Sequence, residues 1–256
     1  MSRLLCAWIL LLCWGHALPV AGEPAADPPT AGAPDTLVTA AGVLVVHPFG
    51  HASLALEWRG RLVAVDPVAP ASRWSQLPRP DLILITHRHG DHFDADTVRE
   101  LAGEFTWVIT TPDVAESIPS CEPLALANGD SANVHGIGIR AVPAANRSAE
   151  RRDFHPRGRD NGYLLDLGGL RVFISGDTED LPEHAELGPV DVAFLAVNQP
   201  YTMTLEQAAA AARAIRPGVL YPYHYRNRDG TLTEVQALRP LLEGESVDEV
   251  RILDWY

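Results

Sequence analysis

The sequence contains no lysine, little cysteine and no apolar run long enough to span a membrane. All 20 basic residues are arginine, which we attribute to codon composition rather than to function. The 33 acidic residues outnumber them and give a formal charge of −13. Because such a protein is repelled by phosphate backbones and by anionic membrane surfaces, we expect no nucleic-acid partner.

The first 22 residues have the composition of a secretory signal peptide. Arg3 precedes an apolar run from Leu4 to Trp14, and small residues follow at Val20 to Gly22. The run is well short of the roughly 20 residues that a spanning helix needs. We therefore expect a cleaved signal, a periplasmic or secreted protein, and no stable membrane span after cleavage. Cys13 follows three leucines, which disfavours lipid attachment.

The rest of the chain predicts one domain behind a short tether. Cleavage would remove Cys6 and Cys13 and leave only Cys121, so no internal disulfide can form. Residues 23–36 are rich in Pro and Ala and cannot bury enough apolar surface to become ordered, so we expect a flexible tether. Residues 37–256 are long enough for a single domain with a sizeable core.

Hydrophobic patterning predicts strands early and alternating strands and helices later. Short strands are expected between residues 42 and 66, followed by the buried strand DLILIT, which ends at His87. Helices are expected at 94–101, at 204–216 with a Thr204/Gln207 capping box, and at 233–244. A last strand is expected at 250–255. This order predicts an α/β fold whose sheets are covered by helices on their outer faces.

The stretch THRHGDHFD places three histidines and two carboxylates within nine residues, at the end of a strand. Side chains at i and i+2 of an extended segment point the same way, so His87 and His89 can face one ion. Gly90 permits a sharp bend that would swing Asp91 and His92 toward a second ion. A solvated loop would explain a lone His-x-His, but the added Asp91 and His92 favour a metal site.

Two later segments offer further ligands. SGDT places Asp177 just after a strand, where a carboxylate could bridge two ions. PYHY places His224 at the end of another strand, where it could complete the second site. Taken singly, Asp177 would be read as a helix cap and His224 as a packed histidine, but in this order both are candidate ligands.

These motifs, with GHASLALEWRGRLVAVDP before them and NGYLLDLGGLRVFISGDTEDLPE around the second, resemble the metallo-β-lactamase superfamily. Within it the chain is similar to the metal-dependent hydrolase branch, which includes ascorbate-6-phosphate lactonase and the N-acylphosphatidylethanolamine phospholipase D type. The resemblance covers nearly all of residues 42–225. It implies an αββα sandwich of two mixed β-sheets flanked by helices, with a dinuclear site. This site usually holds zinc; manganese and iron are the alternatives.

One position departs from the family pattern. Relatives with a complete first site carry a third histidine soon after a strand that resembles IRAVPA, whereas this chain has Asn146 there. Asn is a poorer zinc ligand than imidazole. Either Asn146 supplies a weak oxygen ligand, or His155 in the following loop reaches the first ion. His155 could instead contact the substrate, take part in catalysis or be structural.

The same loop concentrates arginine. Guanidinium groups match phosphate and carboxylate oxygens, so the loop could receive an anionic part of a substrate. The alternative is a solvated loop partly balanced by Glu150, Asp153 and Asp160. The five arginines are Arg147, Arg151, Arg152, Arg157 and Arg159.

A two-metal site would make the protein a hydrolase. A water shared by two ions loses a proton near neutral pH and becomes the nucleophile. Asp91 would be both a ligand and the catalytic residue that orients this water or accepts its proton. Asp66 could hold the other nitrogen of a ligand histidine, and His51 could line the pocket. We expect an exported hydrolase of a small ester, lactone or phosphoester; the alternatives are a phosphodiesterase acting on a lipid or nucleotide and a non-catalytic binding protein with an incomplete metal site.

Overall fold

The computed structural model describes residues 32–68, 70–244 and 247–256. The predicted signal peptide and most of the predicted tether lie outside the described residues. Strand β1 begins at Asp35, just before the predicted start of the domain at residue 37. The Asp35 carboxylate accepts a hydrogen bond from Tyr221 (2.7 Å) and pairs with Arg251 (3.1 Å), so the strand is fastened to residues far along the chain.

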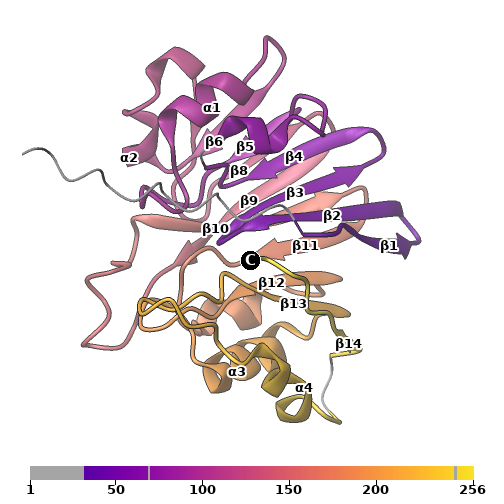
Figure 1. Ribbon diagram of the computed structural model, residues 1–256, viewed down its shortest axis with the longest axis vertical. Helices are drawn as coiled ribbons and strands as arrows, with labels where there is room; N and C mark the ends of the chain where they lie inside the picture. The colour runs from indigo at the N-terminus through magenta and orange to yellow at the C-terminus, as the bar shows by residue number, and fades with distance from the viewer. Residues whose placement is uncertain (1–31, 69, 245–246) are drawn as a thin grey trace, which may run out of the picture.

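The first half of the chain forms a seven-stranded sheet in which the strands follow chain order (Figure 1). Pairing is antiparallel from β1 to β4 and parallel from β4 to β7. The strands are β1 (Asp35–Thr39), β2 (Gly42–Gly50), β3 (Ser53–Trp58), β4 (Arg61–Val65), β5 (Leu82–Leu84), β6 (Trp107–Thr110) and β7 (Leu124–Ala125).

The second half forms another seven-stranded sheet with the same change of direction. Pairing is antiparallel from β8 to β11 and parallel from β11 to β14. The strands are β8 (Ser131–Val134), β9 (Ile137–Ala144), β10 (Asp160–Leu167), β11 (Leu170–Ile174), β12 (Val192–Ala196), β13 (Val219–Tyr223) and β14 (Glu249–Val250).

The helices lie outside the two sheets. In Figure 1, α1 (Ala95–Leu101) and α2 (Pro112–Ala115) lie beside β5 and β6, and α3 (Leu205–Ile215) and α4 (Leu238–Leu241) lie beside β12 to β14. The predicted αββα sandwich of two mixed sheets is confirmed. Within the part of the chain that the structure describes, none of the helices combines the length and apolar character needed to cross a membrane.

The alternation of strand β3 explains how one sheet faces two cores. Leu54 and Leu56 belong to the large cluster that contains residues of both sheets and of α3. Ala55, between them, belongs to the smaller cluster with Val98 of α1 and Val114 of α2. Successive side chains of a strand point to opposite faces, so a strand that is buried on both sides is apolar throughout.

Local signals place two of the three predicted helices. The Asp94 carboxylate caps α1 by accepting from the backbone N–H of Thr97 (2.7 Å). The predicted capping box of Thr204 and Gln207 opens α3, which ends just before Arg216. Because a side-chain oxygen at the cap accepts from an otherwise unpaired N–H, these signals can be read from sequence alone.

The two C-terminal elements are much shorter than predicted. The helix expected over 233–244 is reduced to a 3₁₀ turn and the single turn of α4, which contains Pro240, a residue with no N–H to donate. The strand expected over 250–255 ends at Val250. Beyond it, the Arg251 N–H still donates to the carbonyl of Leu220 in β13 (2.9 Å), whereas the carbonyl of Leu253 accepts from the Tyr225 hydroxyl (2.9 Å).

We expect His184 to destabilise the protein in acid. Its ring is buried (1% exposed) in a 3₁₀ turn, and burial lowers its pKa to about 4. The unfolded chain, with a pKa near 6.5, therefore binds the proton first, so the free energy of unfolding should fall by about 3 kcal/mol as the pH drops from about 6.5 to about 4. Urea unfolding of metal-free parent and His184→Leu at both pH values measures this; equal losses in the two proteins would contradict it.

Candidate metal centre

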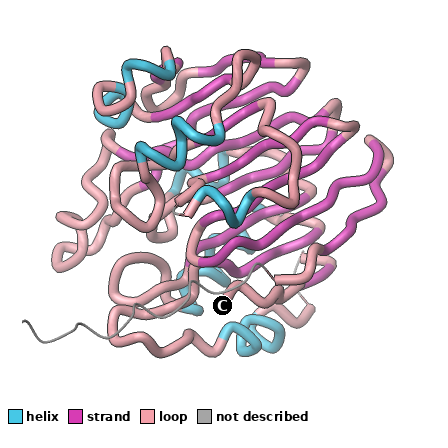
Figure 2. Tube along the Cα trace, turned by 45° about the horizontal axis from the view of Figure 1, so that its top comes forward, coloured by secondary structure: helices cyan, strands magenta, loops and turns pink. Residues whose placement is uncertain are grey.

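The predicted site residues gather at one edge of the sandwich. Parallel strands in a sheet end at the same edge, and long loops collect at one end of the strands in Figure 2. A contact of 3.3 Å between His92 Nε2 and Asp177 Oδ1 joins the loop after β5 to the loop after β11. The residues that follow β4, β5, β11, β12 and β13 at this edge are Asp66, His87, Asp177, Asn198 and His224.

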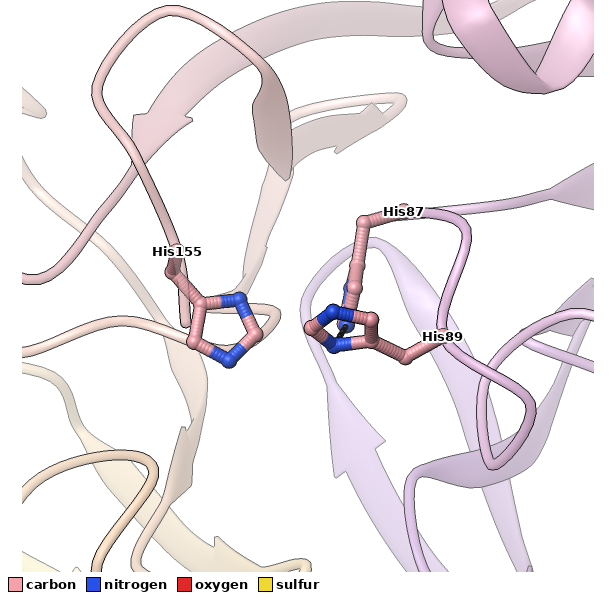
Figure 3. Close-up of side chains that lie close together, drawn as sticks. All are labelled: His87, His89 and His155. Carbon is pink, nitrogen blue, oxygen red and sulfur yellow. Dashed lines mark hydrogen bonds between the residues drawn. The ribbon is translucent and has the colours of Figure 1, made fainter. Parts of the chain in front are cut away.

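Three histidines form a first group of metal-type donors (Figure 3). His87 and His89 leave the loop after β5, with His87 Nε2 at 3.0 Å from His89 Nδ1. His155 comes from the loop before β10 and points toward them, so that one nitrogen of each ring lies within 4.8 Å of the others. His155 Nδ1 donates to the Asp160 carboxylate (2.9 Å), which leaves Nε2 as the nitrogen able to bind an ion.

The side-chain nitrogen of Asn146 is held by neighbouring loops. Its side-chain N–H groups donate to the backbone oxygens of Tyr201 (2.7 Å) and Arg151 (3.1 Å). Its backbone N–H donates to the carbonyl of His155 (2.8 Å). Of the two residues considered for the third position of the first group, the structure places the ring of His155 beside His87 and His89. The side-chain nitrogen of Asn146 bonds to neighbouring loops, and its Oδ1 is buried without a hydrogen-bond partner among the described residues.

The second group contains Asp91, His92, Asp177 and His224. His224 Nε2 lies 3.3 Å from Asp91 Oδ2 and 3.7 Å from Asp177 Oδ1. Asp177 Oδ1 also faces His92, whereas Asp177 Oδ2 lies 3.5 Å from His155 Nε2. The two oxygens of one carboxylate thus face different groups, which is one way in which a carboxylate can bridge two ions.

Asp66 and His51 lie behind and beside these groups. The buried Asp66 carboxylate accepts from the Thr86 N–H (2.7 Å), the Thr86 hydroxyl (2.7 Å) and His92 Nδ1 (2.8 Å). The last bond leaves His92 Nε2 free to face Asp177. His51 lies within 4.8 Å of Asp91 and His224, measured between donor atoms. Burial and the neighbouring His224 lower the pKa of His51 to about 4, so its ring is neutral at pH 7.

The charges at this edge favour a cation. Burial lowers the pKa of His92, but the carboxylates of Asp177, Asp91 and Asp66 raise it well above its ordinary value. Burial opposes ionisation of Asp177 and Asp91, yet the neighbouring histidines hold both pKa values well below the usual range. The carboxylates of the second group are therefore ionised and favour a positive charge beside them, whether a proton on His92 or a metal ion.

The donor set fits metal ions. His92 Nε2 and Asp177 Oδ1 are buried and make no hydrogen bond within the described residues, although each could take part in one. Buried polar atoms are normally paired, and these two atoms, which face each other at 3.3 Å, could instead share an ion as their partner. Imidazole nitrogens with carboxylate oxygens suit zinc, and manganese or iron accept the same ligands.

The arginines of the loop after β9 are largely neutralised. Arg147 pairs with Asp180 (2.9 Å), Arg151 with Glu179 (2.6 Å) and Arg159 with Asp160 (2.6 Å). Arg157 pairs with Glu183. These contacts match the alternative of a charge-balanced loop, although only Asp160 of the three predicted acids is among the partners.

A cavity of about 310 Å³ opens beside both groups. Sequence reasoning missed three of its lining residues, Phe154, Asn198 and Tyr201. Only Asn198 carries a signal that could have been used, because it follows β12 at the same strand edge as the predicted ligands. A larger cavity of about 720 Å³ lies near Phe105 and shares no lining residue with this one. Besides Phe154, Asn198 and Tyr201, the lining residues of the cavity of about 310 Å³ are His89, Asp91, His155 and Asp177.

Two stacked mixed sheets with a histidine and aspartate cluster at one edge define a metal-dependent hydrolase of the metallo-β-lactamase type. A family model described as the beta-lactamase superfamily domain matches residues 46–224, and the chain belongs to that family. The predicted resemblance is confirmed.

Relatives of the chain are described as metal-dependent hydrolases. A UPF0173 metal-dependent hydrolase from Pyrococcus horikoshii is 30% identical over 190 residues, covering 69% of this chain and 82% of the relative. The crystal structure of a proposed metal-dependent hydrolase from Parabacteroides distasonis is 40% identical, with a TM-score of 0.78 and coverage of 86% of this chain and 98% of that one. Igni18, a metallo hydrolase from Ignicoccus hospitalis, shares the fold at 24% identity, with a TM-score of 0.69 and coverage of 82% and 94%. These likenesses support a hydrolase and do not favour the phosphodiesterase or non-catalytic alternatives.

Proposed function

We propose that the protein is an exported, dinuclear metal-dependent hydrolase of a small ester, lactone or phosphoester, with zinc as the expected metal. The observation that carries this proposal is the position of Asp177. Its Oδ1 faces His92 and His224, and its Oδ2 faces His155, so one carboxylate can contribute to both groups. Two bound ions would supply a nucleophilic water near neutral pH and polarise the oxygen of the scissile bond.

Each group has its own ligands in this proposal. His87, His89 and His155 would hold the first ion. Asp91, His92 and His224 would hold the second, with Asp177 shared between the two. His92 keeps the required tautomer because Asp66 accepts from its other nitrogen, which also raises the basicity of the ring.

Asp91 is the proposed catalytic residue. Its carboxylate is 43% exposed and lines the cavity, so it can contact both an ion and the attacking water. Because the pKa of this carboxyl is held below its ordinary range, it is ionised at neutral pH and can accept a hydrogen bond from that water. This orients the water toward the scissile bond.

Metal removal tests the proposed activity. We expect protein purified without added metal to hydrolyse generic ester or phosphodiester reporters, and chelation to lower the rate at least about 100-fold, with recovery on adding zinc. Asp177→Asn is the control for hydrolysis that arises outside the site, because this variant should be inactive as purified, after chelation and after zinc is added. Full activity in protein shown by elemental analysis to be metal-free would contradict the proposal.

Export rests on the predicted signal peptide alone. The amino terminus of the protein recovered from the periplasm is expected near Glu23. Retention of residues 1–22 on protein found only in the cytoplasm would contradict export.

A further inference from the structure

The cavity beside the metal-type donors has an aromatic wall. Phe154 and Tyr201 are both half-buried, and their rings meet edge to face with centroids 5.0 Å apart and an interplanar angle of 79°. Both residues line the cavity of about 310 Å³, together with Asp91 and Asp177. We call this space the aromatic pocket. Its volume is at the lower end of the range for small-molecule sites, enough for a group about the size of one ring with an ester attached.

The described residues that line the aromatic pocket include no arginine. Two arginines of the loop that carries Phe154 are engaged elsewhere: Arg151 pairs with Glu179 and donates to the Thr202 carbonyl (2.9 Å), and Arg159 pairs with Asp160. An anionic group that lay against the aromatic wall, out of reach of a bound ion, would therefore lose hydration without gaining an arginine partner. An uncharged group would not have this cost.

The wall is held in place by side chains that join its two loops. Asn146 donates to the Tyr201 carbonyl (2.7 Å) and to the Arg151 carbonyl (3.1 Å). Arg151 in turn donates to the Thr202 carbonyl. The loop that carries Phe154 is thus fastened to the segment that carries Tyr201, and a preorganised pocket needs little ordering when a ligand binds.

Asn198 adds an uncharged polar group to the pocket. Its side-chain oxygen accepts from the Thr202 hydroxyl (2.7 Å), which orients the amide. The Asn198 Nδ2 atom consequently lies on the site side, 3.3 Å from His224 Nε2. A neutral N–H donor near the site can bind a carbonyl oxygen, on which negative charge develops during ester hydrolysis.

We propose that the aromatic pocket binds a flat, uncharged group of the substrate, and that the substrate is a small neutral carboxylic ester or lactone with an aromatic or cyclic group beside the scissile carbonyl. This inference rests on the proposed hydrolase function. In the reaction the oxygen of water forms a bond to the acyl carbon, the ester C–O bond breaks, and the protons of water end on the leaving alcohol and the released acid.

Three reporters with the same leaving group test the charge preference. The parent protein, loaded with zinc, is assayed with 4-nitrophenyl benzoate, with the monoanionic 4-nitrophenyl succinate and with 4-nitrophenyl phosphate. We expect kcat/KM for the benzoate ester to exceed the other two at least about 10-fold. A higher value for either anionic reporter would overturn the inference and leave the proposed hydrolase standing.

Variants test the wall itself. Phe154→Ala and, as a second variant, Tyr201→Ala should each raise KM for the benzoate ester about 10-fold while changing kcat and metal content little. Phe105→Ala, which removes a 78% exposed aromatic ring outside the pocket, is the matched control and should change neither. Unchanged KM in both folded pocket variants would overturn the inference.

Binding of benzamide separates failure of this inference from failure of the proposed function. Benzamide is uncharged and flat, and calorimetry should give a Kd about 10-fold weaker for Phe154→Ala than for the parent and the Phe105→Ala control. If zinc-loaded protein hydrolyses no reporter but binds benzamide in this way, the proposed function fails and the pocket assignment holds. If the protein hydrolyses the esters but the Kd of benzamide is the same in the parent and in both pocket variants, the pocket assignment fails.

Discussion

Replacing His155 with alanine is expected to reduce the metal content from about two ions per chain to about one and to lower hydrolysis at least about 100-fold. His155 is the member of the first group that comes from the second half of the chain, and its ring completes the set with His87 and His89. Loss of an outer hydrogen-bond partner alone commonly costs about 10- to 100-fold in metal affinity or activity, so loss of the ligand itself should cost more. Elemental analysis of protein purified without added metal measures the ion count.

The metal content of Asn146→Ala is the comparison that tells the two candidate ligands apart. The side-chain N–H groups of Asn146 bond the backbones of Tyr201 and Arg151, and its bond to His155 is made by the backbone N–H, which alanine keeps, so the variant should keep both ions. His135→Ala, at an exposed histidine remote from the site, controls for the loss of any imidazole. Two ions in His155→Ala together with one in Asn146→Ala would reverse the assignment and make Asn146 the ligand.

Replacing Asp66 with alanine should have the largest effect on stability. The buried carboxylate accepts three hydrogen bonds, two from Thr86 and one from His92. Its removal would leave these donors buried and unpaired, at a cost of about 3–5 kcal/mol in the free energy of unfolding. Urea unfolding in the presence of a chelator measures this loss apart from any effect of metal binding.

Asp66→Asn separates the stabilising role from the role in metal binding. The amide keeps the volume and one acceptor oxygen, but it no longer fixes the His92 tautomer, so affinity for the second ion should fall about 10- to 100-fold. Asp180→Asn, which breaks the exposed pair with Arg147, should change stability by less than about 1 kcal/mol. Parent-like metal affinity in Asp66→Asn would show that His92 does not depend on this carboxylate.

The fold and most of the candidate site could be predicted because their signals are local. DLILIT is apolar and branched, and it leads directly into His87; Asp177 and His224 follow later strands in the same way. Parallel strands that end at one edge bring such residues together whatever the loops do. Strand-end position therefore predicted which residues meet before any distance was known.

His155 could be named but not placed, because its position depends on distant contacts. The buried Glu179 carboxylate accepts from the Ser148 N–H (2.7 Å) and pairs with Arg151, which fixes the start of the loop that carries His155. Asp160 then orients the ring. None of these partners follows a periodic pattern, so the sequence left several roles open for His155. The wall formed by Phe154 and Tyr201 was missed for the same reason.

The central claim is that Asp177 joins two metal positions. The most direct test is a crystal structure of the protein purified without added metal, with anomalous diffraction collected at the absorption edge of the metal found by elemental analysis. We predict two anomalous peaks, one among His87, His89 and His155 and the other among Asp91, His92 and His224, each adjacent to a different oxygen of Asp177. A single peak, or two peaks of which one does not adjoin Asp177, would contradict the account.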